Sequence, residues 1–311
     1  MTSPMVTPPI QSGQAAAPTT RRPPTLRRSW MFVAGMDQAA HARAIAGGAD
    51  VVVADLEEFT AAADRPEARL RIAAMMADCR AQGVVGAVRV NKLEHDGHAD
   101  LRGVMAGHPD VVFLPHVDRA EQIVALAAEI SLLEADYGIA PGSTEIAPTI
   151  ESAAGMLALS AIFNASPRVT SCLLAAEDFA ASLGAERGAD GIELRYARSR
   201  FLLECVAAGV VAIDCPCTFR NTTTLTGDLE VARRLGFKSK CVVFPEHVAL
   251  LNAAFTPSVE QVRAAEQLCG AFERQKSAPP ADLALWIDAP LYNNARRLLA
   301  RHAEMDGWRS N

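Results

Sequence analysis

The chain has 311 residues, of which 50% are hydrophobic and 5% aromatic, and its formal net charge is −6. This length and apolar content suffice for one large α/β barrel or for two ordinary domains with an aliphatic core. The acidic balance argues against nucleic acid as the main partner, because a phosphate backbone requires a basic surface. No apolar run reaches the roughly 20 residues that a membrane-spanning helix needs.

The N-terminal segment is basic and rich in proline. Residues 1–36 contain Arg21, Arg22, Arg27 and Arg28 but no Asp or Glu, a bias that transit peptides and twin-arginine signals share. Prolines interrupt the segment and it lacks an amphipathic period, so we interpret residues 1–24 as a disordered tail. The seven cysteines are scattered without a C-x-x-C pair. This usage is typical of a reducing compartment, and we expect a cytoplasmic protein.

Eight short apolar runs alternate with longer helical patterns between residue 29 and about 254. The runs are Ser29–Val33, Val51–Asp55, Val84–Val90, Val111–Leu114, Ile146–Ile150, Ser171–Ala175, Val210–Asp214 and Lys240–Phe244. They are continuously apolar, as in parallel strands that are buried on both faces. The clearest helix covers Ala120–Tyr137, with Gly138 as its C-cap. Eight strand–helix units predict a TIM (β/α)₈ barrel over residues 25–256. A doubly wound open sheet is the alternative, but no Gly-rich phosphate loop follows the first run.

The pattern of the remaining residues, 257–311, predicts a C-terminal arm or lid. A helix is expected from Ser258 to Gln275, followed by a linker with Pro279 and Pro280, and a final helix near Asn293–Glu304. An ordered segment after a proline-rich linker suggests packing on a neighbouring subunit.

Ionisable or polar residues follow five successive runs, where a barrel enzyme keeps its chemistry. They are Asp55, Glu57 and Glu58; Arg89 and Asn91; His116; Glu151; and Glu177 and Asp178. Each acid alone could be a helix cap, but several acids at one mouth repel each other unless a cation offsets them. Mg²⁺ suits one or two carboxylates and fills its remaining positions with water and substrate oxygens. Arg89 can bind a carboxylate through two hydrogen bonds, or pair with a barrel acid.

These residues lie in motifs that resemble the HpcH/HpaI aldolase family, in particular its citrate lyase β-subunit and malyl-CoA/citramalyl-CoA lyase group. The resemblance covers roughly residues 25–304. Its motifs are residues 26–33 (LRRSWMFV), 55–57 (DLE), 88–91 (VRVN), 114–115 (LP), 150–153 (IESA), 176–180 (AEDFA), 196–199 (YARS), 252–257 (NAAFTP) and 287–290 (IDAP).

The resemblance implies a Mg²⁺-dependent carbon–carbon lyase with Glu151 and Asp178 as metal ligands. It implies that Arg89 binds the keto-acid carboxylate and that Asp55 and Glu57 lie near the metal. Asp288 matches an acid that a neighbouring subunit's tail lends to the site, in a trimer or larger homo-oligomer such as a hexamer. Asn91 and His116 are expected to contact substrate. The implied substrate is a 3-hydroxyacyl-CoA thioester such as malyl-, citramalyl- or citryl-CoA.

Several positions depart from the family pattern and bear on the substrate. They are Ala34, Glu58, His116, Phe244 and the run Cys215-Pro216-Cys217. The alternatives are an aldolase that acts on a free 2-keto acid without CoA and a non-catalytic citrate lyase-like subunit; a phosphoenolpyruvate-dependent phosphotransferase is a weaker one. Lys238 and Lys240 are candidates for CoA phosphates, or for a solvated loop.

Overall fold

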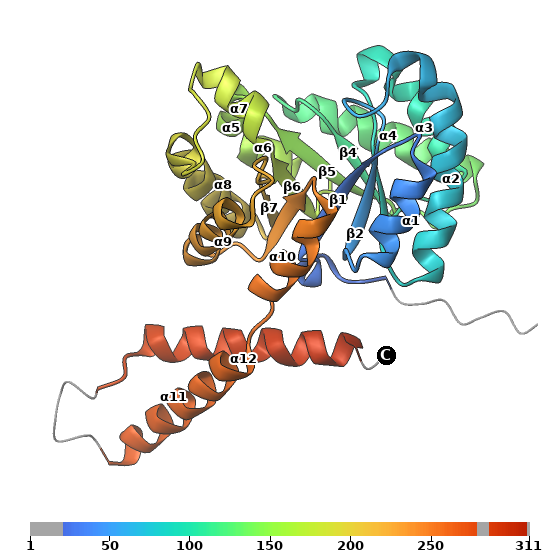
Figure 1. Cartoon of the computed structure of the whole chain (residues 1–311). Coiled ribbons are helices and arrows are strands. Elements are labelled where there is room, and N and C mark those ends of the chain that lie inside the picture. The colour runs from blue at the N-terminus through green and yellow to red at the C-terminus, as the bar shows by residue number, and fades with distance from the viewer. Residues whose placement is uncertain (1–20, 279–285, 310–311) are drawn as a thin grey trace, which may run out of the picture.

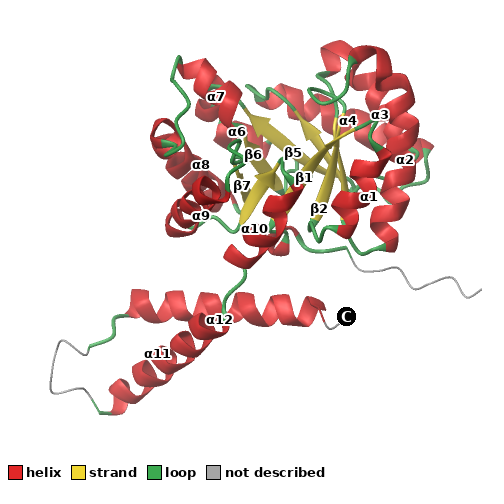
Figure 2. Ribbon diagram, viewed as in Figure 1, coloured by secondary structure: helices red, strands yellow, loops and turns green. Residues whose placement is uncertain are grey.

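The computed structural model describes residues 21–278 and 286–309, and its centre is a closed barrel of eight parallel strands in chain order (Figures 1 and 2). The strands are β1 (Ser29–Ala34), β2 (Val51–Asp55), β3 (Val85–Arg89), β4 (Val111–Leu114), β5 (Glu145–Ile150), β6 (Ser171–Leu174), β7 (Val211–Asp214) and β8 (Ser239–Val242). Strand β1 pairs with both β2 and β8, which closes the barrel. The predicted (β/α)₈ architecture is confirmed, and the doubly wound sheet is excluded.

Helices cover the outside of the barrel. They are α1 (Gln38–Ala46), α2 (Arg65–Ala81), α3 (His98–Met105), α4 (Ala120–Asp136), α5 (Ala153–Leu157), α6 (Leu159–Asn164), α7 (Ala176–Leu183), α8 (Arg195–Ala208), α9 (Thr222–Leu235) and α10 (Val248–Ala254). Short turns are η1 (Pro24–Leu26), η2 (Ala62–Asp64), η3 (Leu93–Gly97), η4 (Ile192–Leu194) and η5 (Pro245–His247). No helix of the described chain is long and apolar enough to cross a membrane.

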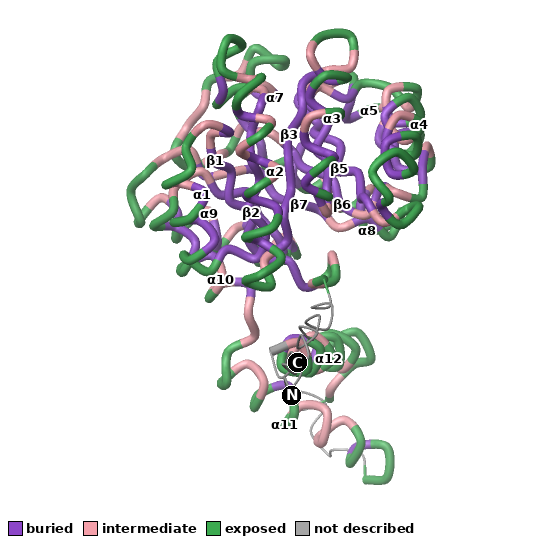
Figure 3. Tube along the Cα trace, turned by 90° about the vertical axis from the view of Figure 1, so that its right-hand side faces the viewer, coloured by how far each residue is buried: buried purple, intermediate pink, exposed green. Residues whose placement is uncertain are grey.

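Two apolar layers hold the barrel together. Alternate strand residues fill its interior, where Phe113 packs edge-on against Trp30 and Phe32. The residues between them face the helices and form the larger core. Because both faces of every strand are buried (Figure 3), the strands read as continuous apolar runs in the sequence. All eight predicted runs form strands, with ends that differ by at most two residues.

Two buried ion pairs tie the chain before β1 to the N-terminal end of the barrel. Arg27 donates two hydrogen bonds to Glu145, of 2.7 and 2.9 Å, and Arg28 donates two to Asp50, each of 2.8 Å. Arg21 joins them with an ion pair of 3.0 Å to Glu145. The disordered tail was predicted to extend to residue 24, but residues 21–24 pack on the barrel. Residues 1–20 of that prediction lie outside the described part of the chain.

The C-terminal arm consists of α11 (Val259–Ser277) and α12 (Ala289–Arg309), which pack against each other beside the barrel (Figure 1). Ser258 caps α11 with a capping box, as expected near this residue. The final helix begins four residues earlier than predicted, and the predicted prolines of the linker, 279 and 280, lie outside the described residues. Arg301 of α12 donates hydrogen bonds to the carbonyl oxygens of Thr25 and Lys238, which precede β1 and β8. The arm therefore lies at the N-terminal end of its own barrel and does not cover its own mouth.

Lys240 does not meet solvent or the mouth of the barrel, so its predicted role as a phosphate contact or loop residue is wrong. It is fully buried on β8, where its Nζ lies 2.7 Å from Asp214 and 2.6 Å from Asp228. Arg198 of α8 completes the network with two hydrogen bonds to Asp214 and one to Asp228. Two cations and two carboxylates thus compensate each other between the sheet and the helices.

Candidate active site

The C-terminal ends of β2 to β5 bring together a group of the predicted site residues, namely Asp55, Glu57, Arg89, His116 and Glu151. Asp55 ends β2 and Arg89 ends β3, and the two residues are register partners, so their side chains point to the same side of the sheet. Arg89 donates two parallel hydrogen bonds to the Asp55 carboxylate, from Nε at 2.7 Å and from Nη2 at 2.6 Å. Both residues are buried. Arg89 therefore has a fixed position at the floor of the mouth.

The Asp55 carboxylate also shapes the loop that follows β2. Its two oxygens accept hydrogen bonds from the backbone N–H groups of Glu57 and Phe59, each of 3.0 Å. The hydroxyl of Thr60 donates to the Asp55 carbonyl oxygen at 2.6 Å. This tight turn presents Glu57 and Glu58 toward Arg89. The sequence placed Glu58 after the second run and marked it as a departure from the family pattern, but assigned it no role in the site.

Two further carboxylates share the Arg89 guanidinium. Glu57 lies 3.1 Å from Nη1 and Glu58 lies 3.0 Å from Nη2. Burial raises the pKa of Glu58, and the nearby negative charges of Glu57 and Asp178 add to this, against an opposing effect of Arg89. Burial also disfavours the charge on Glu57, but His116 and Arg89 outweigh it and lower its pKa. The predicted alternative that Arg89 pairs with barrel acids is confirmed.

His116 lies between two carboxylates from different strands. Its Nδ1 is 2.7 Å from Glu151 Oε2, and its Nε2 is 3.6 Å from Glu57 Oε1. The nearby carboxylates of Glu151 and Glu57 raise the pKa of His116 to about 10, against the effect of burial. His116 has a positive φ of 51°, an uncommon conformation for a residue other than glycine. An imidazolium therefore bridges the ends of β4 and β5.

Glu151 and Asp178 have the properties that a site for a divalent cation needs. Glu151 is 4% exposed, and its Oε1 is buried without a hydrogen-bond partner in the described structure. A buried charged oxygen without a partner is costly, and a cation would satisfy it. Asp178 lies in the first turn of α7, makes no hydrogen bond or ion pair with another described residue, and is near enough to raise the pKa of Glu58.

No three His, Cys, Asp or Glu side chains within residues 21–278 and 286–309 form a ready cluster for a metal. A site built on two carboxylates alone suits Mg²⁺, which keeps water and substrate oxygens in its other positions. It does not suit structural zinc, which needs four protein ligands. The residues present thus fit the predicted cation.

Three further residues, which are predicted site residues or sequence neighbours of one, make contacts outside the group around Arg89. The Asn91 side-chain amide donates to the Leu56 carbonyl and to Asp100, at 3.0 and 2.8 Å, so it ties the loops after β2 and β3 together. Glu177 accepts hydrogen bonds from Thr218 and Arg187. Asp288 caps α12 by accepting a hydrogen bond from the Leu291 N–H at 2.8 Å. The substrate contact of Asn91 and the catalytic role of Asp288 stay predictions.

Comparisons with known proteins identify the family of the chain. A model of the HpcH/HpaI aldolase/citrate lyase family matches residues 28–245. Citrate lyase subunit beta of Haemophilus influenzae is 32% identical over 283 residues, which cover 89% of this chain and 97% of that protein. The L-malyl-CoA/beta-methylmalyl-CoA lyase of Cereibacter sphaeroides is 31% identical over 82% of this chain and 87% of its own.

A solved structure extends the likeness to the fold. Protein CitE from Mycobacterium tuberculosis, in complex with magnesium, acetoacetate and coenzyme A, has a TM-score of 0.71 and 26% identity. The match covers 89% of this chain and 98% of that one.

Proposed function

Because the chain belongs to the HpcH/HpaI aldolase/citrate lyase family, we propose that it is a Mg²⁺-dependent carbon–carbon lyase of CoA thioesters. It cleaves or forms a 3-hydroxyacyl-CoA such as malyl-, citramalyl- or citryl-CoA, and the products of cleavage are a 2-keto or oxo acid and an acyl-CoA. The observation that carries the proposal is the buried, unpartnered Oε1 of Glu151 beside the Arg89 cluster. The buried free cysteines of the described chain agree with a cytoplasmic location.

Glu151 and Asp178 would hold Mg²⁺. The bound ion supplies Lewis-acid polarisation of the oxygens of the reacting hydroxyl and carboxylate. His116 lies 2.7 Å from Glu151 Oε2 and leaves Oε1, the oxygen without a hydrogen-bond partner, for the cation. Its other carboxylate partner, Glu57, keeps His116 at the same edge of the mouth.

Arg89 binds and orients the carboxylate of the keto-acid part. Asp55 holds the guanidinium from behind, so the Nη atoms face Glu57 and Glu58 at the mouth. Glu58 is the most exposed of the three acids, and burial raises its pKa. It is therefore the partner that a substrate carboxylate displaces at the lowest cost, and the incoming carboxylate gains a charge-assisted hydrogen bond.

Asp288 transfers the proton on the acyl side of the reaction. In the cleavage direction a base at the mouth takes the proton of the substrate hydroxyl, the electron pair of the breaking carbon–carbon bond passes to the enolate of the acyl-CoA, and protonated Asp288 gives its proton to that enolate. In the synthetic direction Asp288 removes that proton. Since the arm lies at the N-terminal end of its own barrel, Asp288 serves the mouth of a neighbouring subunit in a trimer or hexamer.

The test is the release of keto acid from malyl-, citramalyl- and citryl-CoA with Mg²⁺ present. We expect Glu151→Ala and Asp178→Ala each to abolish Mg²⁺-dependent turnover. Glu177→Ala is the matched control, because Glu177 lies in the same turn as Asp178 but bonds to Thr218 and Arg187. Full activity in both metal-ligand variants would contradict the proposal.

A second function is favoured by the citrate lyase subunit beta of Haemophilus influenzae, which the chain matches over 97% of that protein's length. In this case the chain would act as one subunit of a larger lyase, and the isolated protein would show no turnover with free CoA thioesters.

Titration with CoA and acetyl-CoA separates the CoA-dependent reactions from an aldolase that uses free 2-keto acids, because only the former predict saturable binding.

A further inference from the structure

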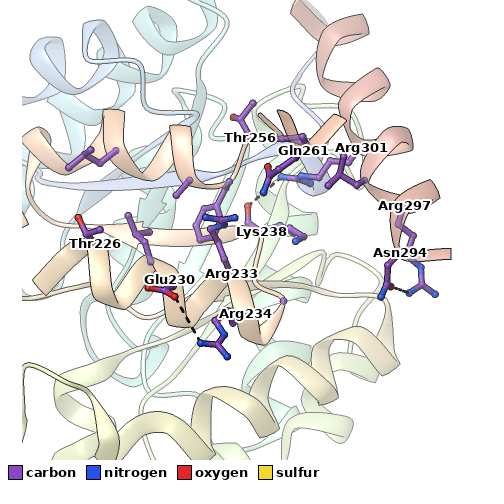
Figure 4. A pocket seen from close by; sticks show the side chains of 17 residues that line it. Thr226, Glu230, Arg233, Arg234, Lys238, Thr256, Gln261, Asn294, Arg297 and Arg301 are labelled. Carbon is purple, nitrogen blue, oxygen red and sulfur yellow. Dashed lines mark hydrogen bonds and ion pairs between the residues drawn. The ribbon is translucent and has the colours of Figure 1, made fainter. Parts of the chain in front are cut away.

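A cavity lies far from the mouth, at the junction between the barrel and the arm. It is a cleft of about 870 Å³, lined by α9, the loop before β8, the end of α10, the start of α11, and α12 (Figure 4). Arg301 of α12 marks its position, because it bonds to carbonyl oxygens that precede β1 and β8. The cleft is thus at the opposite end of the barrel from Arg89 and Glu151.

The cleft has an excess of positive charge. Five basic side chains line it, and its one acid, Glu230, is 4.0 Å from Arg234. The four others form no ion pair with a carboxylate of the described chain. They are Arg233, Lys238, Arg297 and Arg301. They come from both the barrel and the arm, and Figure 4 shows them around a common space.

The basic side chains of the cleft repel one another. Partial removal from solvent lowers the pKa of Lys238, and the guanidinium groups of Arg301 and Arg233 lower it further. Burial and the charge of Arg28 likewise lower the pKa of Arg301. The Nε of Arg301 is buried and has no hydrogen-bond partner among the described residues. Like charges at this spacing are unfavourable unless an anion offsets them.

Apolar side chains form a further part of the lining, which limits the kind of ligand that fits. Leu229, Leu250, Phe255, Pro257 and Leu298 provide this surface. The volume lies within the range of small-molecule sites. Residues 1–20 of the chain cannot supply the negative charge that would offset these basic side chains, because they contain no Asp or Glu.

We propose that this cleft binds a small organic polyanion, a phosphate ester or a polycarboxylate, and that the ligand bridges the barrel and the arm. Arg233 and Lys238 hold its anionic groups from the barrel, and Arg297 and Arg301 hold them from α12. The apolar wall receives the carbon skeleton. Binding neutralises the repulsion across the junction and fixes the arm, which carries Asp288, relative to the barrel.

Calorimetric titration of the full-length protein, without Mg²⁺, tests the proposal with ADP, pyrophosphate and citrate as probes. We expect saturable binding of at least one probe, weakened when salt is added. The double variant Arg233→Glu/Arg297→Glu changes two exposed residues and should weaken binding at least tenfold. Arg263→Glu, on the exposed face of α11, leaves the cleft intact and should bind as the unmodified protein does. ADP and pyrophosphate report on phosphate groups, and citrate reports on carboxylates.

Two results would overturn the proposal. The first is that no probe binds saturably, or that binding is the same in the double variant. The second is that the double variant changes the oligomer size in sedimentation without a change in probe affinity, because the basic surface would then serve contact with a second copy. Substitution of Arg89 should leave binding in the cleft intact, which separates this site from the mouth.

Discussion

Asp55 and Arg89 are register partners on adjacent strands, and two parallel hydrogen bonds of 2.7 and 2.6 Å join them inside the barrel mouth. The same carboxylate accepts two backbone N–H groups from the loop that carries Glu57 and Glu58. One buried acid therefore positions both the anion receptor and the acids around it. Asp55 is therefore a positioning residue: it acts through Arg89 and the loop, and it need not touch substrate.

Asp55→Asn tests this role. The amide keeps one acceptor for the loop but loses the bidentate, charged contact with Arg89, so the guanidinium is held less firmly. We expect kcat/KM to fall about 100-fold, which corresponds to about 2.7 kcal/mol of transition-state stabilisation. Glu58→Gln is the comparison, because it removes only the exposed partner of Arg89 and should lower the KM for the substrate. Equal losses in both variants would refute the positioning role.

His116→Gln should increase the affinity for Mg²⁺ several-fold. In the present structure the imidazolium occupies Glu151 Oε2 at 2.7 Å and competes with a cation for that carboxylate. Glutamine removes the positive charge and keeps a polar side chain of similar reach. Calorimetric titration with MgCl₂ at constant pH provides the measurement. An unchanged or weaker affinity would show that His116 orients Glu151 rather than competing for it.

The barrel could be predicted from the sequence because each strand is buried on both faces. The runs Val51–Asp55 and Val111–Leu114 are continuously apolar, and they form β2 and β4 with the same bounds. The order of strands and the side on which chemistry gathers then follow from the fold rule for parallel barrels. The convergence of Arg89, Glu57, His116 and Glu151 follows from that rule together with the residues after each strand.

The pairing of charges could not be predicted in the same way. Lys240 stands in a predicted strand, yet a lysine on a strand carries no sign of which helix will supply its acid. Its partners Asp214 and Asp228 come from β7 and α9, and Arg198 comes from α8. Such a network depends on which helix faces which strand, and one sequence does not contain this information. The same is true of the bridge that His116 makes between Glu57 and Glu151.

Lys240→Met should destabilise the protein by about 3–5 kcal/mol, because it leaves the buried carboxylate of Asp214 and the partly buried carboxylate of Asp228 with only Arg198 to compensate them. Urea denaturation followed by circular dichroism measures the change. Lys276→Met is the control, since its ion pair with Glu273 is exposed and contributes little. If both variants unfold at the urea concentration of the unmodified protein, the buried network does not contribute to stability.

Glu134 should make the stability of the barrel sensitive to acid. Burial alone would raise the pKa of Glu134, but the Arg168 guanidinium and the N–H groups of Thr144 and Gly142 outweigh it and lower the pKa to about 2. In the unfolded chain a glutamate titrates near about 4.3. The unfolded state therefore binds the proton more readily, and the stabilisation, complete at neutral pH, is lost as the pH falls from about 4.3 toward 2.

We expect Glu134→Gln to lower the urea midpoint at pH 7 and to approach the unmodified protein at pH 3. Glu121→Gln, an exposed position on the same helix, should follow the unmodified protein at every pH. A difference for Glu134→Gln that stays constant between pH 7 and pH 3 would rule out the linkage.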